Sequence, residues 1–337
     1  MDHPVSAERI PAPRLPARVP AKTAGQFDVR DDLTCIPQSL VNIYFYGRPH
    51  SADRSWVLID AGLPFSADSI VAAAAQRYGE SSRPAAIILT HGHFDHVGGL
   101  PALADRWEVP VYAHRLELPY LTGRSSYPPP DPAVGGGIMS FLSRFYPRGP
   151  IDLGRRAMVL PSDGTIPGMS GWRWIHTPGH TAGHVSLFRD YDRTLIAGDA
   201  FVTTRQESAL AALAKWPQVS RPPAYYTSDW SAARRSVAAL ADLNPEVGAT
   251  GHGIPMYGEP LRQQLDALVR NWDRVAVPAH GRYVRRPAIT GVDGVVSVPP
   301  PVFDSQLLIL AGLSIAACLG WNMLRRSQGE REVSASR

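Results

Sequence analysis

The residues best suited to chemistry lie at 90–99, THGHFDHVGG, where three histidines and one aspartate occupy six consecutive positions. Neutral imidazole and carboxylate are common zinc donors. The stretch follows an apolar run at 85–89, AAIIL, that has the character of a buried strand. A loop at a strand end can turn His91 and His93 toward one point and Asp95 and His96 toward a neighbouring one. The spacing therefore predicts two adjacent metal ions rather than a histidine-rich surface loop.

Further coordinating side chains follow strand-like runs later in the chain. TPGHTAGH at 177–184 offers His180 and His184, AGDA at 197–200 offers Asp199, and TGHG at 250–253 offers His252. No Gly-x-Ser-x-Gly elbow occurs, so the sequence announces no side-chain nucleophile. Chemistry that relies on a metal-activated water fits this set of residues.

Strand and helix patterns alternate along the chain, which predicts an α/β architecture. The expected strands are at 40–47, 55–62, 85–89, 109–114, 171–180, 184–190, 193–200 and 247–253. The expected helices are at 66–78, with Ser66 as N-cap, and at 97–106, 229–243 and 259–277. Residues 121–150 show no period and are interpreted as an irregular lid or insertion near the surface.

In this order, the motifs resemble those of the metallo-β-lactamase-fold hydrolase superfamily: His-x-His-x-Asp-His, then His, Asp and His. The matching segments run from about residue 40 to 260. The resemblance implies a four-layer αββα sandwich, with two β-sheets flanked by helices and metals at one edge. It also implies two zinc ions, one held by His91, His93 and His180 and the other by Asp95, His96 and His252, with Asp199 bridging both.

The glyoxalase II-like and lactonase-like branch is the most similar part of the superfamily. It implies a binuclear-zinc hydrolase whose metal-bridging hydroxide attacks a small thioester, lactone or other ester, with Asp95 and Asp199 as catalytic residues. Two alternatives stay open: a mononuclear iron dioxygenase acting on a persulfide or thiol, and a non-catalytic membrane-tethered binding protein.

Supporting roles are assigned to four further residues. Asp60, at the end of VLID, is a candidate hydrogen-bond partner for a ligating imidazole, or else a strand-end cap. His184 is expected behind the metal ligands, as a buried structural residue rather than a metal contact. Tyr225 and Tyr226 are candidate substrate contacts that could stabilise an oxyanion, against the simpler interpretation of aromatic packing beneath a lid.

The ends of the chain differ from its middle. Residues 1–25 are expected to be a flexible Pro/Arg-rich arm, 26–280 the catalytic domain, 281–305 a Pro/Val-rich linker, 306–326 a transmembrane or packed helix, and 327–337 a polar tail. The helix prediction rests on 307–324, an uncharged apolar stretch of 18 residues that is just long enough for a bilayer core. A cytoplasmic catalytic domain is expected, and its anchoring to a membrane by this helix is left open.

Composition limits the partners. A formal net charge of +4 over 337 residues is too weak to indicate nucleic acid binding. The two cysteines, Cys35 and Cys318, imply no disulfide framework. The expected partner is a small-molecule ester, thioester or lactone, while membrane association through the C-terminal helix and a homodimer are left open.

Overall fold

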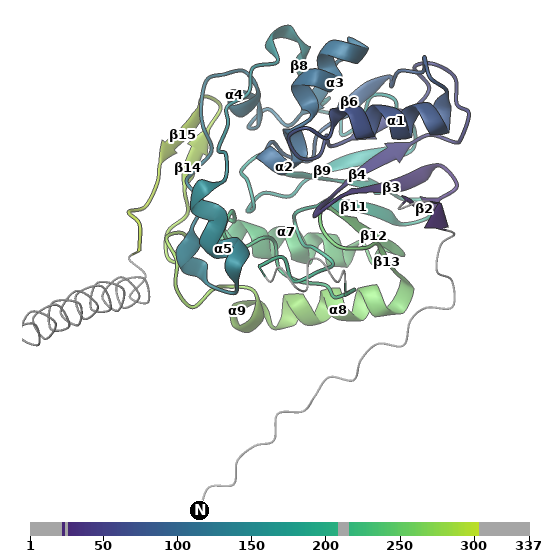
Figure 1. The fold of residues 1–337 in the computed structure, drawn as a ribbon. Helices are drawn as coiled ribbons and strands as arrows, with labels where there is room; N and C mark the ends of the chain where they lie inside the picture. Colours follow the sequence, from purple (N-terminus) through teal and green to yellow (C-terminus); the bar gives the residue numbers. More distant parts are fainter. Residues whose placement is uncertain (1–21, 24–25, 208–215, 303–337) are drawn as a thin grey trace, which may run out of the picture. The chain divides into compact units, whose positions relative to one another are not determined.

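Two β-sheets form the centre of the fold in the computed structural model, which describes residues 22–23, 26–207 and 216–302 (Figure 1). The first sheet has eight strands in the order β1 to β8. They span β1 Lys22–Thr23, β2 Gln26–Arg30, β3 Leu33–Gln38, β4 Val41–Tyr46, β5 Val57–Ile59, β6 Ala86–Ile88, β7 Val111–Ala113 and β8 Ala157–Val159.

The second sheet has five strands in the order β13-β12-β11-β10-β9. They span β9 Trp172–His176, β10 Val185–Arg189, β11 Thr194–Gly198, β12 Val247–Thr250 and β13 Met256–Tyr257. A separate hairpin, β14 Ile289–Gly291 and β15 Gly294–Ser297, follows near the end of the described residues.

Helices cover the outer face of each sheet. The first sheet carries α1 Ala67–Tyr78, α2 Phe94–Val97 and α3 Leu100–Trp107, and the second carries α7 Trp230–Asp242, α8 Gly258–Arg270 and α9 Trp272–Val275. Five short helices lie along the chain between β7 and β8: α4 Leu118–Leu121, η1 Pro132–Val134, α5 Ile138–Leu142, η2 Ser143–Phe145 and η3 Gly154–Arg156.

Three apolar cores separate the four layers. One buries Ile70 of α1 and Leu103 of α3 against the first sheet. The middle core joins the facing sides of the two sheets, and the third buries Val237 of α7 and Leu265 of α8 against the second sheet. The predicted αββα sandwich is therefore confirmed.

The direction of the strands places their ends at one edge. Strands β5 to β8 are parallel to one another, as are β11 and β12. Because carboxyl ends of parallel strands open on the same edge, the residues after β5, β6, β11 and β12 can meet there. All four of these segments carry a predicted site residue.

Local structure departs from the sequence expectations in several places. Strands β2 and β3 were not expected, and the helix expected at 97–106 is replaced by α2 and α3, so that Asp95 and His96 lie on a helical turn. Ser66 does precede α1, but its hydroxyl donates to the carbonyls of Ala61 and Leu63 and caps no helical N–H.

The lid and the expected linker are also more ordered than predicted. Residues 121–150 contain η1, α5 and η2, and the expected 281–305 linker contains the β14–β15 hairpin. Two residues that precede this hairpin contact the lid at 121–150. The N–H of Arg282 donates to Asp131 Oδ2 at 2.5 Å, and the hydroxyl of Tyr283 donates to Pro129 O at 2.6 Å.

The prediction of a transmembrane helix is wrong for the part of the chain that the structure describes. No helix within 22–23, 26–207 and 216–302 is long and apolar enough to cross a membrane. The segment that suggested the anchor, 307–324, lies outside the described residues.

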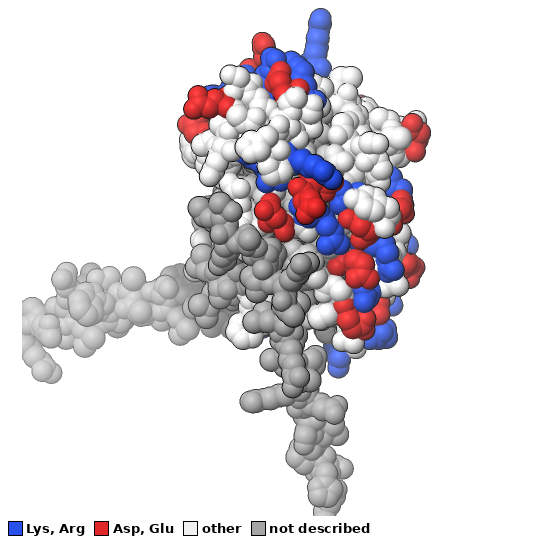
Figure 2. Space-filling view, turned by 90° about the vertical axis from the view of Figure 1, so that its right-hand side faces the viewer, with Lys and Arg blue, Asp and Glu red and all other residues white. Residues whose placement is uncertain are grey.

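On the face shown in Figure 2, acidic and basic side chains are interspersed.

Candidate metal centre

Every residue predicted to bind metal lies just after a strand or on the short helix α2. His91 and His93 follow β6, His180 follows β9, Asp199 follows β11 and His252 follows β12. Six of the seven donors, all except Asp95, are at most 4% exposed. Segments that are up to 161 positions apart in the sequence, such as those of His91 and His252, thus meet at one edge of the sandwich.

The side chains gather into three overlapping groups whose donor atoms lie within 4.8 Å of one another. The groups are His91, His93 and His180; His91, His96 and Asp199; and Asp95, His96 and His252. The first and third groups are those that the family resemblance implied for two separate metals, and Asp199 belongs to the group between them. The geometry therefore brings together all seven predicted donors.

Asp199 is central to the arrangement. Its Oδ2 atom lies 3.5 Å from Nε2 of His180, 3.6 Å from Nε2 of His96 and 3.1 Å from Nε2 of His252. Asp95 is less buried, and its Oδ2 lies 3.5 Å from Nε2 of His252. One carboxylate oxygen thus faces donors from both predicted metal sites, which is the position that a bridging ligand requires.

Protein groups hold the imidazoles from behind. His96 Nδ1 donates to Asp60 Oδ2 at 2.9 Å, and His252 Nδ1 donates to the carbonyl of Leu40 at 2.7 Å. His91 Nδ1 contacts the Thr90 hydroxyl at 3.1 Å, which itself donates to Asp60 at 2.8 Å. The expected role of Asp60 thus agrees with its contacts. Such partners fix the tautomer and direct Nε2 toward a metal.

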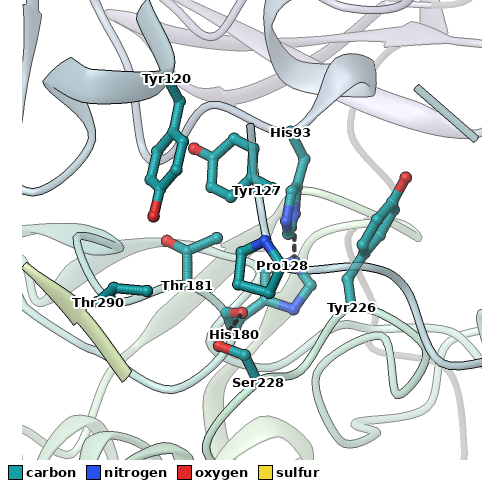
Figure 3. Close-up of a pocket in the computed structure, with 10 residues that line it drawn as sticks. His93, Tyr120, Tyr127, Pro128, His180, Thr181, Tyr226, Ser228 and Thr290 are labelled. Atoms are coloured by element: carbon teal, nitrogen blue, oxygen red, sulfur yellow. Dashed lines mark hydrogen bonds between the residues drawn. The ribbon is translucent and has the colours of Figure 1, made fainter. Parts of the chain in front are cut away.

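Unsatisfied atoms test whether these residues fit a cation. Among the described residues, His91 Nε2, His96 Nε2 and Asp199 Oδ1 are buried without a hydrogen-bond partner. His93 Nδ1 and His180 Nε2 lie 3.0 Å apart and point toward one another (Figure 3). Buried polar atoms normally find partners, and a cation among the three unpartnered atoms would satisfy them. Imidazole and carboxylate donors of this kind bind either zinc or iron.

Burial and neighbouring charges set the protonation states of the donors. Burial lowers the pKa of His91 and His93 well below 6.5, and the neighbouring histidines lower it further. Burial would raise the pKa of Asp199, but His252 and His96 hold it well below its ordinary value. Burial would lower the pKa of His96 and His252, but the carboxylate of Asp199 raises it above 6.5. Since metals bind neutral imidazoles and ionised carboxylates, His91, His93 and Asp199 are already in the binding form, whereas His96 and His252 would release a proton on binding.

His184 has both nitrogens occupied by protein groups. Its Nε2 accepts the backbone N–H of Asp199 at 2.9 Å, and its Nδ1 contacts the hydroxyl of Thr177 at 2.8 Å. Burial lowers its pKa to about 3, so it stays neutral. It therefore holds Asp199 in place and has no nitrogen left for a metal.

The two tyrosines contact the site through their rings. Tyr226 stacks on His93 with ring centroids 4.2 Å apart, and its hydroxyl donates to Pro147 O at 3.4 Å. Tyr225 is buried, with its ring 5.8 Å from that of Tyr146. These contacts agree with aromatic packing beneath a lid rather than with a hydroxyl directed at a substrate oxygen.

His114 and His176 form a stacked pair with ring centroids 4.2 Å apart.

Sequence reasoning missed two residues beside the site. Glu117 and Tyr127 are both buried, and the phenol of Tyr127 donates to the Glu117 carboxylate. No local pattern in the sequence marks either residue. Tyr127 also lines a small pocket, partly open to solvent, together with His93, Tyr120, His180, Thr181 and Thr290 (Figure 3).

Comparison with known proteins agrees with this site. The family model described as the metallo-beta-lactamase superfamily matches residues 36–252, which is more than half of the chain. The chain belongs to the metallo-beta-lactamase superfamily. All seven donors fall within the matched residues.

Relatives of this chain include a "Probable metallo-hydrolase YflN" of Bacillus subtilis, 45% identical over 256 residues, which cover 76% of this chain and 96% of that protein. A "Probable metallo-hydrolase YybB" of the same organism is 31% identical, over 44% of this chain and 59% of that protein. Among solved structures, a B3 metallo-beta-lactamase with an active-site glutamic acid is 18% identical with a TM-score of 0.50, over 75% of this chain and 90% of that one. This likeness shows the fold alone.

Proposed function

We propose that this metallo-beta-lactamase superfamily member is a binuclear-zinc hydrolase of small thioesters, lactones or other esters. The observation that carries the proposal is the position of Asp199 Oδ2, within 3.1 to 3.6 Å of nitrogens from both donor groups. His91, His93 and His180 would hold one ion, and Asp95, His96 and His252 the other. When bound, such a pair of ions supplies an activated water and a polarised substrate carbonyl.

The protein residues would divide the remaining work. Asp199 is held through its backbone by His184 and so keeps its carboxylate between the two groups. Asp95 is the most exposed of the seven donors, with 14% of its side chain accessible, so it can orient an attacking water and accept its proton. The relatives described as metallo-hydrolases support a hydrolytic reaction.

Aromatic groups beside Asp95 support an organic ester as substrate. The ring of Phe94 lies 5.3 Å from that of Tyr146 and 6.4 Å from that of Tyr226. Aromatic surfaces of this kind favour the apolar part of an acyl or alcohol group.

Elemental analysis of the purified chain, paired with an Asp199→Ala variant, tests the proposal. Close to two zinc ions per chain, falling sharply in the variant, is the expected result, together with cleavage of a thioester, a lactone or an aryl ester by the metal-loaded wild type. About one iron per chain, unchanged in the variant, would overturn the proposal and favour oxygen chemistry on thiols or persulfides. Failure of a zinc-loaded preparation to cleave any of the three substrates would refute hydrolysis.

A further inference from the structure

The buried carboxylate of Glu117 connects the two loops that carry the donors of the first metal group. Glu117 is 0% exposed and immediately precedes α4. Its Oε2 accepts the backbone N–H of Gly92 at 3.0 Å, and its Oε1 accepts the hydroxyl of Thr181 at 2.7 Å and the N–H of Gly183 at 2.9 Å. A fully buried carboxylate with this many donors is fixed in position.

The positions of these donors give the contacts their meaning. Gly92 lies between His91 and His93, and Thr181 directly follows His180. Glu117 therefore ties the loop of the first sheet to the loop of the second sheet at the residues adjacent to three candidate ligands. Those loops present His93 Nδ1 and His180 Nε2 only 3.0 Å apart.

Two glycines make room for this connection. A Cβ atom added to Gly183 would lie 2.6 Å from Glu117 Oε1, and one added to Gly92 would lie 2.6 Å from the hydroxyl of Tyr127. Both distances are too short for a real Cβ contact, so any side chain at these positions would displace the carboxylate or the phenol. The close approach is thus built into both loops.

Tyr127 extends the connection to the lid. Its hydroxyl donates to Glu117 Oε2, accepts the N–H of Gly92 at 2.9 Å, and its ring lies 4.6 Å from that of His93. Figure 3 shows Tyr127 beside His93, and Thr181 on the His180 side of the same pocket. One end of the lid is thereby joined to the donor loop.

We propose that Glu117 is a positioning residue that sets the metal affinity of the His91, His93 and His180 group by holding its two loops in register. The inference rests on the proposed metal site and names a residue that itself binds no metal. A substitution that keeps the volume of Glu117 but replaces one accepting oxygen with a donating N–H₂ should lower the metal affinity of this group. The metal affinity of the Asp95, His96 and His252 group should change much less.

The test is Glu117→Gln in the full chain, in the wild-type background and in an Asp95→Ala background that lacks one donor of the other group. A glutamine presents an amide N–H₂ either to Gly92 N–H or to Thr181 and Gly183, so a donor faces a donor. Zinc affinity is measured by competition with a chelator, and the unfolding temperature is measured on the metal-free proteins. We expect affinity in the Asp95→Ala background to fall about 10-fold or more, in line with partners of metal ligands.

Two matched variants separate positioning from general destabilisation. Glu207→Gln changes another buried glutamate, which accepts from Arg221 Nε and Ala224 N, and should leave zinc affinity unchanged. Tyr127→Phe removes one donor to Glu117 but keeps the carboxylate, and should have a smaller effect than Glu117→Gln. An equal loss of affinity in Glu207→Gln would overturn the proposal, because burial alone would then explain it.

The outcomes distinguish this inference from the proposed function. Unchanged zinc affinity in Glu117→Gln, with two zinc ions still bound by the wild type, would refute the inference and leave the function standing. If the wild type binds zinc and Glu117→Gln lowers the zinc affinity as expected, but the wild type cleaves no ester, the inference is supported and hydrolysis is refuted. A wild type that binds no metal would refute both.

Discussion

Asp60 Oδ2 accepts a hydrogen bond from Nδ1 of His96 over 2.9 Å, and the same carboxylate accepts both the N–H and the hydroxyl of Thr90, each at 2.8 Å. Because Thr90 also contacts His91, one buried carboxylate directly after β5 orients an imidazole in each donor group. Asp60 itself adopts a φ of 59°, a conformation that suits a residue held by such contacts.

Replacement of this carboxylate should weaken metal binding. In Asp60→Asn the negative charge is lost and His96 Nδ1 no longer has a strong acceptor, so we expect zinc affinity and ester hydrolysis to fall about 10- to 100-fold. Chelator competition measures the first quantity and steady-state kinetics the second. Asp53→Asn is the control, since Asp53 pairs with Arg83 on the surface. Unaltered zinc affinity in Asp60→Asn would show that Asp60 is only a strand-end cap.

Space for Asp199 depends on Gly251. A Cβ atom at this position would lie 2.1 Å from Asp199 Oδ1 and 2.8 Å from Cε1 of His96. Gly251→Ala should therefore displace the central carboxylate and reduce bound metal from two ions per chain to one or none, as measured by elemental analysis. Gly291→Ala is the matched control, because its nearest neighbour would be 3.8 Å away. Full metal content in both variants would contradict the central position of Asp199.

The donor set could be predicted from the sequence because each motif is short and follows a strand. His91 to His96, His180, Asp199 and His252 each stand at a strand end, and strand ends of parallel segments meet at one edge. The supporting residues carry no such mark. Glu117 has contacts 25 and 66 positions away, and nothing in the neighbouring residues indicates them.

The sequence did not predict β3 or the short helices of the lid, because these segments contain prolines or glycines that ordinarily disfavour regular structure. Pro37 lies within β3, and proline ordinarily argues against a strand that pairs on both sides. In the lid, the prolines at 128–130 and the glycines at 135–137 hide the short helices η1 and α5. Tertiary contacts such as Asp131 N–H to Tyr225 O, at 2.7 Å, order this segment, and no local preference encodes them.

Acid should destabilise the fold partly through His114. Burial lowers the pKa of His114 to about 4, and His176, which stacks on it, lowers it further in the same direction. The unfolded chain, with a pKa near 6.5, binds a proton more readily, so stability is complete above about pH 6.5 and falls as the pH drops toward 4.

The size of this effect is measurable by urea unfolding at pH 7 and pH 5. The His114 contribution to the decrease should be at most about 2 kcal/mol. In His114→Gln, the decrease between the two pH values should shrink by up to that amount. An identical decrease in both proteins would show that His114 does not contribute to acid sensitivity.

Arg189 should stabilise the fold without contributing to the metal centre. This β10 residue is 2% exposed, donates to Asp32 Oδ2 at 2.6 Å and to Asp192 Oδ2 at 2.7 Å, and lies over the ring of Trp172 at 4.8 Å. Arg189→Met keeps the apolar stem but leaves both carboxylates without this cation, so unfolding should require about 3 kcal/mol less free energy. Urea unfolding at pH 7 measures the loss.

Arg189→Lys provides the matched comparison. Lysine restores the charge but cannot contact both carboxylates through a planar fork, so its stability should lie between those of the wild type and Arg189→Met. Zinc content per folded chain should stay the same in all three proteins, because Arg189 contacts none of the seven donors in the described part of the chain. If Arg189→Met were as stable as the wild type, the result would show that the desolvation cost of the buried guanidinium offsets the stabilisation from its ion pairs.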